Sequence, residues 1–293
     1  MTLRDLQYLV ALAETRHFGH AAERCHVSQP TLSAQLRKLE EFLGVSLIER
    51  RPRRVGLTPA GDAVVERARR MLRDAEDIRA LARASQDPFG GQLKVGLIPT
   101  LGPYLLPRVA PRIAKALPKL QLMLHEYQTA PLVDRVVQGE LDVAILALPA
   151  DTKGLATRSL FAEAFLVAMP EHHRLSARKR LKPADLAAEK LLLLEEGHCL
   201  RDQALEVCAR AGTEEQDFRA TSLETLRQMV AAGLGITLLP RLAAEGPFAS
   251  ARGLVVRPFS PPAPSRVIGA AWRRSTSRAA AIAAVCDIIA KAA

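Results

Sequence analysis

The sequence predicts an α/β protein built from three consecutive parts. Helical spacing of apolar residues marks a small unit at the N-terminus, one charged helix follows it, and short apolar runs alternate with helical segments over the rest of the chain. A chain of 293 residues exceeds what one ordinary hydrophobic core accommodates. We therefore expect three parts at residues 1–58, 59–88 and 89–293, and we expect the last part to form two lobes.

The first 58 residues predict three helices and a basic hairpin. Apolar spacing gives helices over Leu3–Thr15, Gly19–Val27 and Pro30–Leu43, and Gly44 ends the third. The third helix would bury a leucine stripe and present short polar and basic groups on its other face, which suit base edges and phosphates: Ser28, Gln29, Pro30, Thr31, Ser33, Gln35, Arg37 and Lys38. A hairpin follows with four bases: Arg50, Arg51, Arg53 and Arg54. This order predicts a winged helix-turn-helix that binds double-stranded DNA.

A long helix from Pro59 to about Ser85 follows, with Thr58 as its cap. Its apolar residues recur at alternating spacings of four and three, at Val64, Ala68, Met71, Ala75, Ile78 and Ala82. Such a seam suits either a two-stranded coiled coil or a linker helix packed on its own domain. We favour a homodimer because the stripe is narrow and the other faces are charged. Asp87–Gly91 reads as a linker.

Beyond the linker the chain alternates strands and helices. Strands are expected over Leu93–Ile98, Leu120–Tyr127, Leu141–Leu148, Leu160–Met169, Lys190–Leu194, Phe218–Thr221, Ile236–Leu239, Leu254–Phe259 and Val267–Trp272, and a helix over Arg278–Lys291. This pattern predicts two open α/β subdomains with largely parallel sheets. Ligands of such sheets bind beyond the carboxyl ends of the strands.

That rule selects a small polar cleft. Thr100 and Thr129 follow two strands, His198 and Cys199 follow a third, and Asp202 stands one helical turn past the thiol. Plainer roles remain open, because threonines cap helices and a histidine is commonly structural. We expect Cys25 and Cys286 to be inert core residues. The spacing of Cys199 and Cys208 does not fit a zinc site, and no cofactor is predicted.

Charge and composition narrow the classes of protein to which the chain can belong. The formal net charge of +10 indicates an anionic partner, although bulk charge alone does not establish nucleic-acid binding. The N-terminus has no basic stretch followed by an apolar run, and no apolar run reaches about 18 residues. We therefore expect a cytoplasmic protein without a membrane span, in which four cysteines do not form a secreted disulfide framework.

A family resemblance rests on a long ordered match. The pattern Leu6 to Phe18, Ala21-Ala22, Ser28 to Ser33, Leu43-Gly44 and Leu57 to Gly61 resembles the N-terminal domain of LysR-type transcriptional regulators. The resemblance implies a two-lobed effector domain similar to periplasmic binding proteins. It also implies a transcription regulator that works as a homodimer or homotetramer and contacts RNA polymerase.

The segment Leu192–Ala204, with Cys208 behind it, resembles the sensor segment of peroxide-responsive members of that family. This resemblance implies that hydrogen peroxide oxidises Cys199, that Cys208 resolves it as a disulfide, and that antioxidant genes are activated. It also implies a peroxide pocket formed by Thr100, Thr129, His198, Asp202 and Arg266.

Physical chemistry supports these roles. A helix N-terminus, His198 and Arg201 are each expected to lower the pKa of the Cys199 thiol. If residues 200–208 are helical, the Cα atoms of Cys199 and Cys208 lie about 13 Å apart, whereas a disulfide tolerates at most about 7 Å. The helix must then unwind for the bond to form. Closing the loop contributes roughly 2.7 kcal/mol, enough to bias a marginal element without unfolding a domain.

Three rival functions are compatible with parts of the sequence. The first is a regulator that binds a small organic anion in the same cleft and has incidental cysteines. The second is a thiol peroxidase, in which a DNA-reading domain has no purpose. The third is a solute-binding protein, which is disfavoured by the absence of a signal peptide and by the recognition helix.

Overall fold

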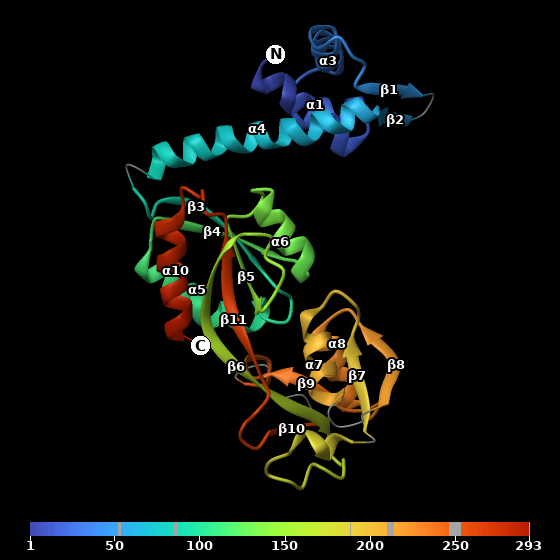
Figure 1. Cartoon of the computed structure of the whole chain (residues 1–293), viewed down its shortest axis with the longest axis vertical. Helices are drawn as coiled ribbons and strands as arrows, with labels where there is room; N and C mark the ends of the chain where they lie inside the picture. Colours follow the sequence, from blue (N-terminus) through green and yellow to red (C-terminus); the bar gives the residue numbers. More distant parts are fainter. Residues whose placement is uncertain (52–53, 85–86, 188, 210–213, 246–252, 293) are drawn as a thin grey trace. The chain divides into compact units, whose positions relative to one another are not determined.

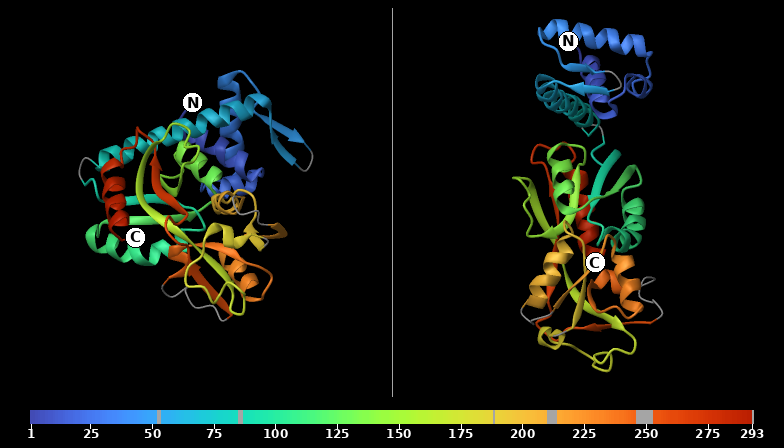
Figure 2. Two further views of the ribbon diagram at one scale, coloured as in Figure 1. Left: turned by 60° about the horizontal axis from the view of Figure 1, so that its bottom comes forward. Right: turned by 90° about the vertical axis from the view of Figure 1, so that its right-hand side faces the viewer.

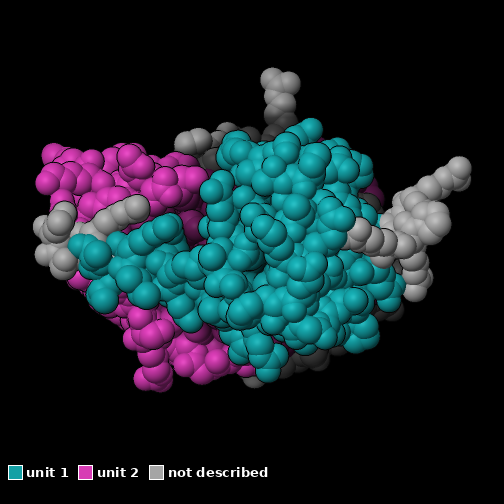
Figure 3. Space-filling model, turned by 90° about the horizontal axis from the view of Figure 1, so that it is seen from above, with its two compact units in different colours: residues 1–82 teal, residues 83–293 magenta. Residues whose placement is uncertain are grey.

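The computed structural model describes residues 1–51, 54–84, 87–187, 189–209, 214–245 and 253–292. The chain divides into two compact units, Met1–Ala82 and Arg83–Ala293, which Figure 3 colours separately. We call them unit 1 and unit 2 and describe each by itself.

Unit 1 contains the three expected helices. They are α1 (Leu3–Thr15), α2 (Phe18–Arg24) and α3 (Gln29–Leu43), packed around a leucine core that includes Leu9, Leu12, Leu32, Leu36 and Leu39. The Ser28 side chain caps α3 by accepting from the Thr31 amide at 3.3 Å, and Gly44 ends it with φ +68°. Leu32, Leu36 and Leu39 are buried as predicted, which leaves the polar face of α3 outward.

A hairpin and a long helix complete unit 1 (Figure 1). Strands β1 (Ile48–Arg51) and β2 (Arg54–Leu57) pair antiparallel, and α4 runs from Pro59 to Ala84. The Thr58 hydroxyl accepts from the Gly61 amide at 2.9 Å and donates to the Ser46 carbonyl at 2.7 Å, so it caps α4 and ties it to the chain before β1. A Cβ at Gly61 would lie 2.1 Å from the Leu47 carbonyl oxygen, so only glycine fits there.

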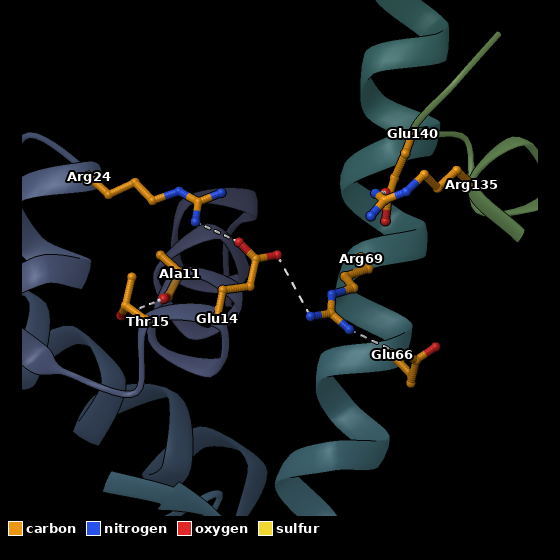
Figure 4. Close-up of polar contacts among 8 residues, drawn as sticks. All are labelled: Ala11, Glu14, Thr15, Arg24, Glu66, Arg69, Arg135 and Glu140. Carbon is orange, nitrogen blue, oxygen red and sulfur yellow. Dashed lines mark hydrogen bonds and ion pairs between the residues drawn. The ribbon is translucent and has the colours of Figure 1, made fainter. Parts of the chain in front are cut away.

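Ion pairs join three helices of unit 1, as Figure 4 shows. The Glu14 carboxylate on α1 contacts Arg24 of α2 at 2.7 Å and Arg69 of α4 at 3.7 Å, and Arg69 also pairs with Glu66 at 3.2 Å. All of these groups are at least one third exposed, so each pair contributes little energy. They link α1 to α2 and to the middle of α4.

Unit 2 is built on a mixed sheet. The strands are β3 (Gly91–Leu97), β4 (Leu120–Glu126), β5 (Val143–Leu148), β6 (Ala156–Pro170), β9 (Thr237–Pro240), β10 (Leu254–Pro258) and β11 (Ser265–Trp272). Their order is β10-β6-β11-β5-β3-β4, with β9 also on β6, while β7 (Lys190–Leu194) and β8 (Glu214–Ala220) form a second, parallel sheet. The prediction of largely parallel sheets was wrong, because β11 pairs antiparallel with both β5 and β6.

Strand β6 passes from one lobe of unit 2 into the other (Figure 1). Its first part pairs with β11, and its last residues pair with β9 and β10. The first lobe holds β3, β4, β5, α5 (Gly102–Ala116), α6 (Thr129–Val137) and α10 (Ala279–Ala292). The second lobe holds β7, β8, β9, β10, the 3-10 helix η1 (Pro183–Leu186), α7 (Cys199–Ala209), α8 (Leu223–Ala231) and α9 (Arg241–Ala244). Figure 2 shows both lobes, which share one hydrophobic core.

Candidate functional site

The candidate redox residue lies at the junction of a buried strand and a helix. Strand β7 ends at Leu194, a turn follows, and Cys199 is the first residue of α7. Within the turn, Gly197 has φ +92°, and a Cβ there would lie 2.5 Å from the Gln128 side-chain oxygen. The Gln128 amide group also donates to the Glu196 carbonyl at 3.4 Å. A residue of the first lobe thus holds the loop that carries the thiol.

Two of the predicted pocket residues, Thr129 and Thr100, belong to the first lobe and lie near the Cys199 thiol. Thr129 begins α6, and its hydroxyl, which lies near Cys199, lowers the pKa of that thiol. The Thr129 hydroxyl oxygen is buried and has no hydrogen-bond partner among the described residues, so it is available to a ligand or to the thiolate. Thr100 is 2% exposed and accepts from Arg266 through its hydroxyl at 3.0 Å and its carbonyl at 3.1 Å. Thr100 and Thr129 therefore lie close to Cys199, at the strand ends where open sheets of this kind bind ligands.

Arg266 lies fully buried near the start of β11. Its guanidinium contacts one carboxylate oxygen of Glu163 through Nε and Nη2, both at 2.8 Å. The other Glu163 oxygen accepts from the Leu242 amide at 2.8 Å, at the start of α9. Sequence reasoning missed Glu163, and the one signal available was an acidic residue inside an apolar strand pattern.

Burial raises the pKa of the Cys199 thiol, and the Arg266 charge, the Thr129 hydrogen bond and the Leu200 amide oppose that rise without overcoming it. Asp202, which is exposed on α7, adds to the rise. The prediction of a lowered pKa for the Cys199 thiol was wrong, because burial outweighs the groups that favour its ionisation. His198 is 5% exposed, and burial lowers its pKa, which favours the uncharged imidazole.

The predicted partner thiol is on the same helix. Cys208 lies within α7, which runs unbroken from Cys199 to Ala209, and its side chain lies outside the described part of the structure. The segment between the two cysteines is helical, as the prediction required. Their Cα atoms are therefore separated by about 13 Å along the helix axis. Cys199, Cys25 and Cys286 are free thiols, and burial raises the pKa of Cys286 to about 11.

Unit 1 presents the polar face expected of a recognition helix. Ser28, Gln29, Pro30, Thr31, Arg37 and Lys38 are exposed, and Ser33 and Gln35 are half-buried. Ser28 and Thr31 share a hydrogen bond at 2.8 Å, so both hydroxyls also serve the cap. Of the basic hairpin, Arg50, Arg51 and Arg54 lie in β1 and β2 with side chains outside the described part, and Arg53 lies outside the described residues.

The apolar stripe predicted along α4 is covered near the start of the helix and exposed further along it. Val64 packs against the core of unit 1 and Ala68 is 1% exposed, whereas Met71 and Ile78 are 44% and 68% exposed. The linker interpretation therefore holds for the first turns of the helix, and the later turns keep an open apolar edge. Among the described residues, no helix has the length and apolarity that crossing a bilayer requires.

Both units match known protein families. Residues 3–62 match the model of the bacterial regulatory helix-turn-helix proteins of the lysR family, and residues 86–293 match the LysR substrate binding domain. The chain belongs to the LysR family.

Among LysR relatives, the chain is 51% identical to the DNA-binding transcriptional dual regulator OxyR of Escherichia coli K12, over 93% of this chain and 90% of that protein. A full-length OxyR variant from Pseudomonas aeruginosa superposes with a TM-score of 0.78 at 43% identity, covering 100% of this chain and 99% of that one. A second relative, the regulator EstR of Acinetobacter baylyi, is 41% identical over 98% of this chain and 96% of that protein. The chain is therefore a homologue of OxyR within the LysR family.

Proposed function

We propose that this LysR-family protein is a transcription regulator that senses hydrogen peroxide at Cys199 and responds by forming a disulfide with Cys208. The observation that carries the proposal is the position of the Cys199 thiol, half-buried at the start of α7 near Arg266 and Thr129. Support also comes from relatives described as hydrogen peroxide-inducible genes activators and from an OxyR structure of Corynebacterium glutamicum described as H2O2-bound.

The chemistry proceeds in two balanced steps. The Cys199 thiolate attacks one peroxide oxygen, the O–O bond breaks, and hydroxide leaves and takes up a proton to give water, so that Cys199 becomes a sulfenic acid. The Cys208 thiol then attacks the Cys199 sulfur and releases a second water as the disulfide forms. Thr129 hydrogen-bonds the thiolate, and Thr100 and His198 complete the peroxide pocket with Asp202 at its edge.

The second step makes the site a switch. Because helix α7 separates the two Cα atoms by about 13 Å and a disulfide allows at most about 7 Å, α7 has to unwind. Oxidation therefore changes the fold of the second lobe, and the change alters how the regulator meets its promoter.

The DNA partner is read by unit 1. In this proposal α3 enters the major groove with Gln29, Thr31, Ser33 and Gln35 toward base edges, while Arg37, Lys38 and the arginines of the hairpin hold phosphates. The exposed edge of α4 at Met71 and Ile78 supports a homodimer that reads paired half-sites. We further propose a homotetramer in the cytoplasm that recruits RNA polymerase to antioxidant genes.

The rival ligand, a small organic anion, fits the cleft less well. Its natural partner would be the buried Arg266, but the Glu163 carboxylate already pairs with that guanidinium at 2.8 Å. An anion would have to displace or share a buried ion pair, which is costly. Calorimetry with small carboxylates tests this rival directly, and tight binding without any thiol reactivity would favour it.

The test compares footprints of reduced and peroxide-treated protein on its own upstream DNA. Cys199→Ser is expected to abolish the peroxide-dependent change while DNA binding remains, and Cys208→Ser to leave the response impaired because the sulfenic acid is not resolved. Cys286→Ser, a buried thiol outside the site, is the control. A full peroxide response in Cys199→Ser protein would refute the proposal.

A further inference from the structure

Glu163 and Arg266 form an ion pair at the crossing of the two lobes. They are direct register partners on β6 and β11, and their side chains are 2% and 0% exposed. The guanidinium contacts the same Glu163 oxygen twice at 2.8 Å. A buried pair of this kind is screened weakly by water, so its charges act on neighbouring groups more strongly than surface charges do.

The same carboxylate is held from the second lobe. Its other oxygen accepts from the Leu242 amide at 2.8 Å, and that amide belongs to α9. Glu163 is therefore fixed on one side by backbone and on the other by the guanidinium. Arg266 is in turn fixed by two contacts to Thr100 of the first lobe. The arrangement leaves the guanidinium little freedom to move.

Arg266 is the charge that most favours ionisation of the Cys199 thiol. The other groups that bear on the thiol are the Thr129 hydroxyl, the Leu200 amide and the Asp202 carboxylate, and the last of these disfavours ionisation. Burial lowers the pKa of His198, next to Cys199 in the chain, so the charged form of this imidazole is disfavoured. The Glu163 carboxylate, paired with Arg266 at 2.8 Å, offsets part of the positive charge that favours ionisation of the thiol.

We propose that Glu163 is a positioning residue of the redox site: it fixes the Arg266 guanidinium beside Cys199 and, by offsetting part of its charge, restrains the reactivity of the thiol. The inference rests on the proposed function and adds a residue that controls the sensitivity of the sensor. Glu163 then lowers the reactivity of Cys199, and removal of its charge should accelerate the reaction of the thiol with peroxide and with alkylating reagents.

The sign of the effect separates this role from a purely structural one. In Glu163→Gln the amide oxygen can still accept from Arg266, the hydrogen bond from the Leu242 amide is lost because the NH2 group then faces that N–H, and the negative charge is gone, so the guanidinium stabilises the thiolate more. A residue that only supported the fold would give the opposite result, because a displaced Arg266 would leave the thiol harder to ionise. Glu163→Asp keeps the charge but withdraws it by one methylene, so it should act in the same direction as Glu163→Gln and more weakly.

The experiment measures the pH profile of Cys199 alkylation by iodoacetamide in the full-length reduced protein, read by mass spectrometry of the Cys199 peptide. The expected result for Glu163→Gln is a midpoint lower by about one pH unit, the size of shift that a neighbouring charge commonly produces. Nucleophilicity falls as the pKa of a thiol falls, so the rate at pH 7 should rise roughly threefold per unit rather than tenfold. Peroxide consumption by Cys199 should rise by the same factor.

The matched control is Glu189→Gln. Glu189 is also nearly buried at 8% exposed, and it pairs with Arg174 at 2.5 Å and contacts His173 at 3.0 Å, away from the thiol. Its loss should leave the alkylation midpoint unchanged. An unchanged or raised midpoint in folded Glu163→Gln protein overturns the proposal, and if that variant does not fold, the same result in Glu163→Asp overturns it. Because alkylation needs no peroxide, a failure of peroxide sensing would show separately.

Discussion

Unwinding of α7 can be tested with two substitutions at one exposed position. Glu206 lies within α7 and is exposed, so replacing it with glycine or alanine removes the same carboxylate and changes only the helix propensity. Glycine is about 1 kcal/mol less favourable than alanine inside a helix. If the disulfide state has lost this helix, that cost applies to the reduced state alone. The ratio of oxidised to reduced protein should then be about fivefold higher for Glu206→Gly than for Glu206→Ala.

The assay equilibrates both full-length variants in glutathione redox buffers and measures the Cys199–Cys208 disulfide by alkylation and mass spectrometry. The formation of sulfenic acid at Cys199 should proceed at the same rate in both, because it precedes unwinding. Arg112 is exposed on α5, a helix not expected to unwind, and its glycine and alanine variants are the control pair. Equal disulfide fractions for the two Glu206 variants would refute the argument that α7 has to open.

Three further predictions concern the DNA-binding face, the start of α4 and the buried histidine. Arg37→Ala should weaken DNA binding and reduce the slope of log affinity against log salt by about 0.9 if Arg37 neutralises one phosphate; an unchanged slope in anisotropy titrations would exclude that contact. Thr58→Ala should lower the free energy of unfolding by about 1 kcal/mol through the lost cap, and Gly61→Ala should lower it more, because its Cβ would meet the Leu47 carbonyl oxygen at 2.1 Å; denaturant unfolding measures both. Burial lowers the pKa of His198, so the folded state binds a proton less readily than the unfolded state. The stability due to neutral His198 is therefore full above pH 6.5 and is lost as pH falls below it, and urea unfolding should show a weaker acid dependence for His198→Gln.

Local patterns predicted most elements of this fold because their causes are local. The capping hydroxyl of Ser28, the helix-ending Gly44 and the leucine stripe of α3 act within a few residues of one another. The strand-end rule likewise predicted that Thr100, Thr129 and Cys199 lie close together, and the structure brings them together around Arg266; their role in binding peroxide stays a prediction.

The sheet direction and the ion pair could not be predicted in this way. An alternation of strands and helices carries no information on where the last strand inserts, and β11 enters antiparallel between β5 and β6. That insertion places Arg266 opposite Glu163, 103 residues away in sequence. In the sequence alone Glu163 reads as a solvent-facing strand residue, because its partner is fixed only by long-range register.

The pKa of Cys199 illustrates the same limit and clarifies how the site works. Its position at a helix N-terminus predicted an acidic thiol, but burial is a tertiary property and outweighs the local effect. A half-buried thiol with a raised pKa reacts slowly with most reagents, so low thiol acidity is not a defect in a sensor. Reactivity toward a small oxidant then depends on a few fixed groups, chiefly Arg266 and Thr129, and Glu163 modulates the first of them. Completion of the response depends on a second barrier, the opening of α7. Two barriers in series let the proposed sensor respond to a small peroxide that reaches the thiol, while reagents that cannot enter the site leave the helix intact.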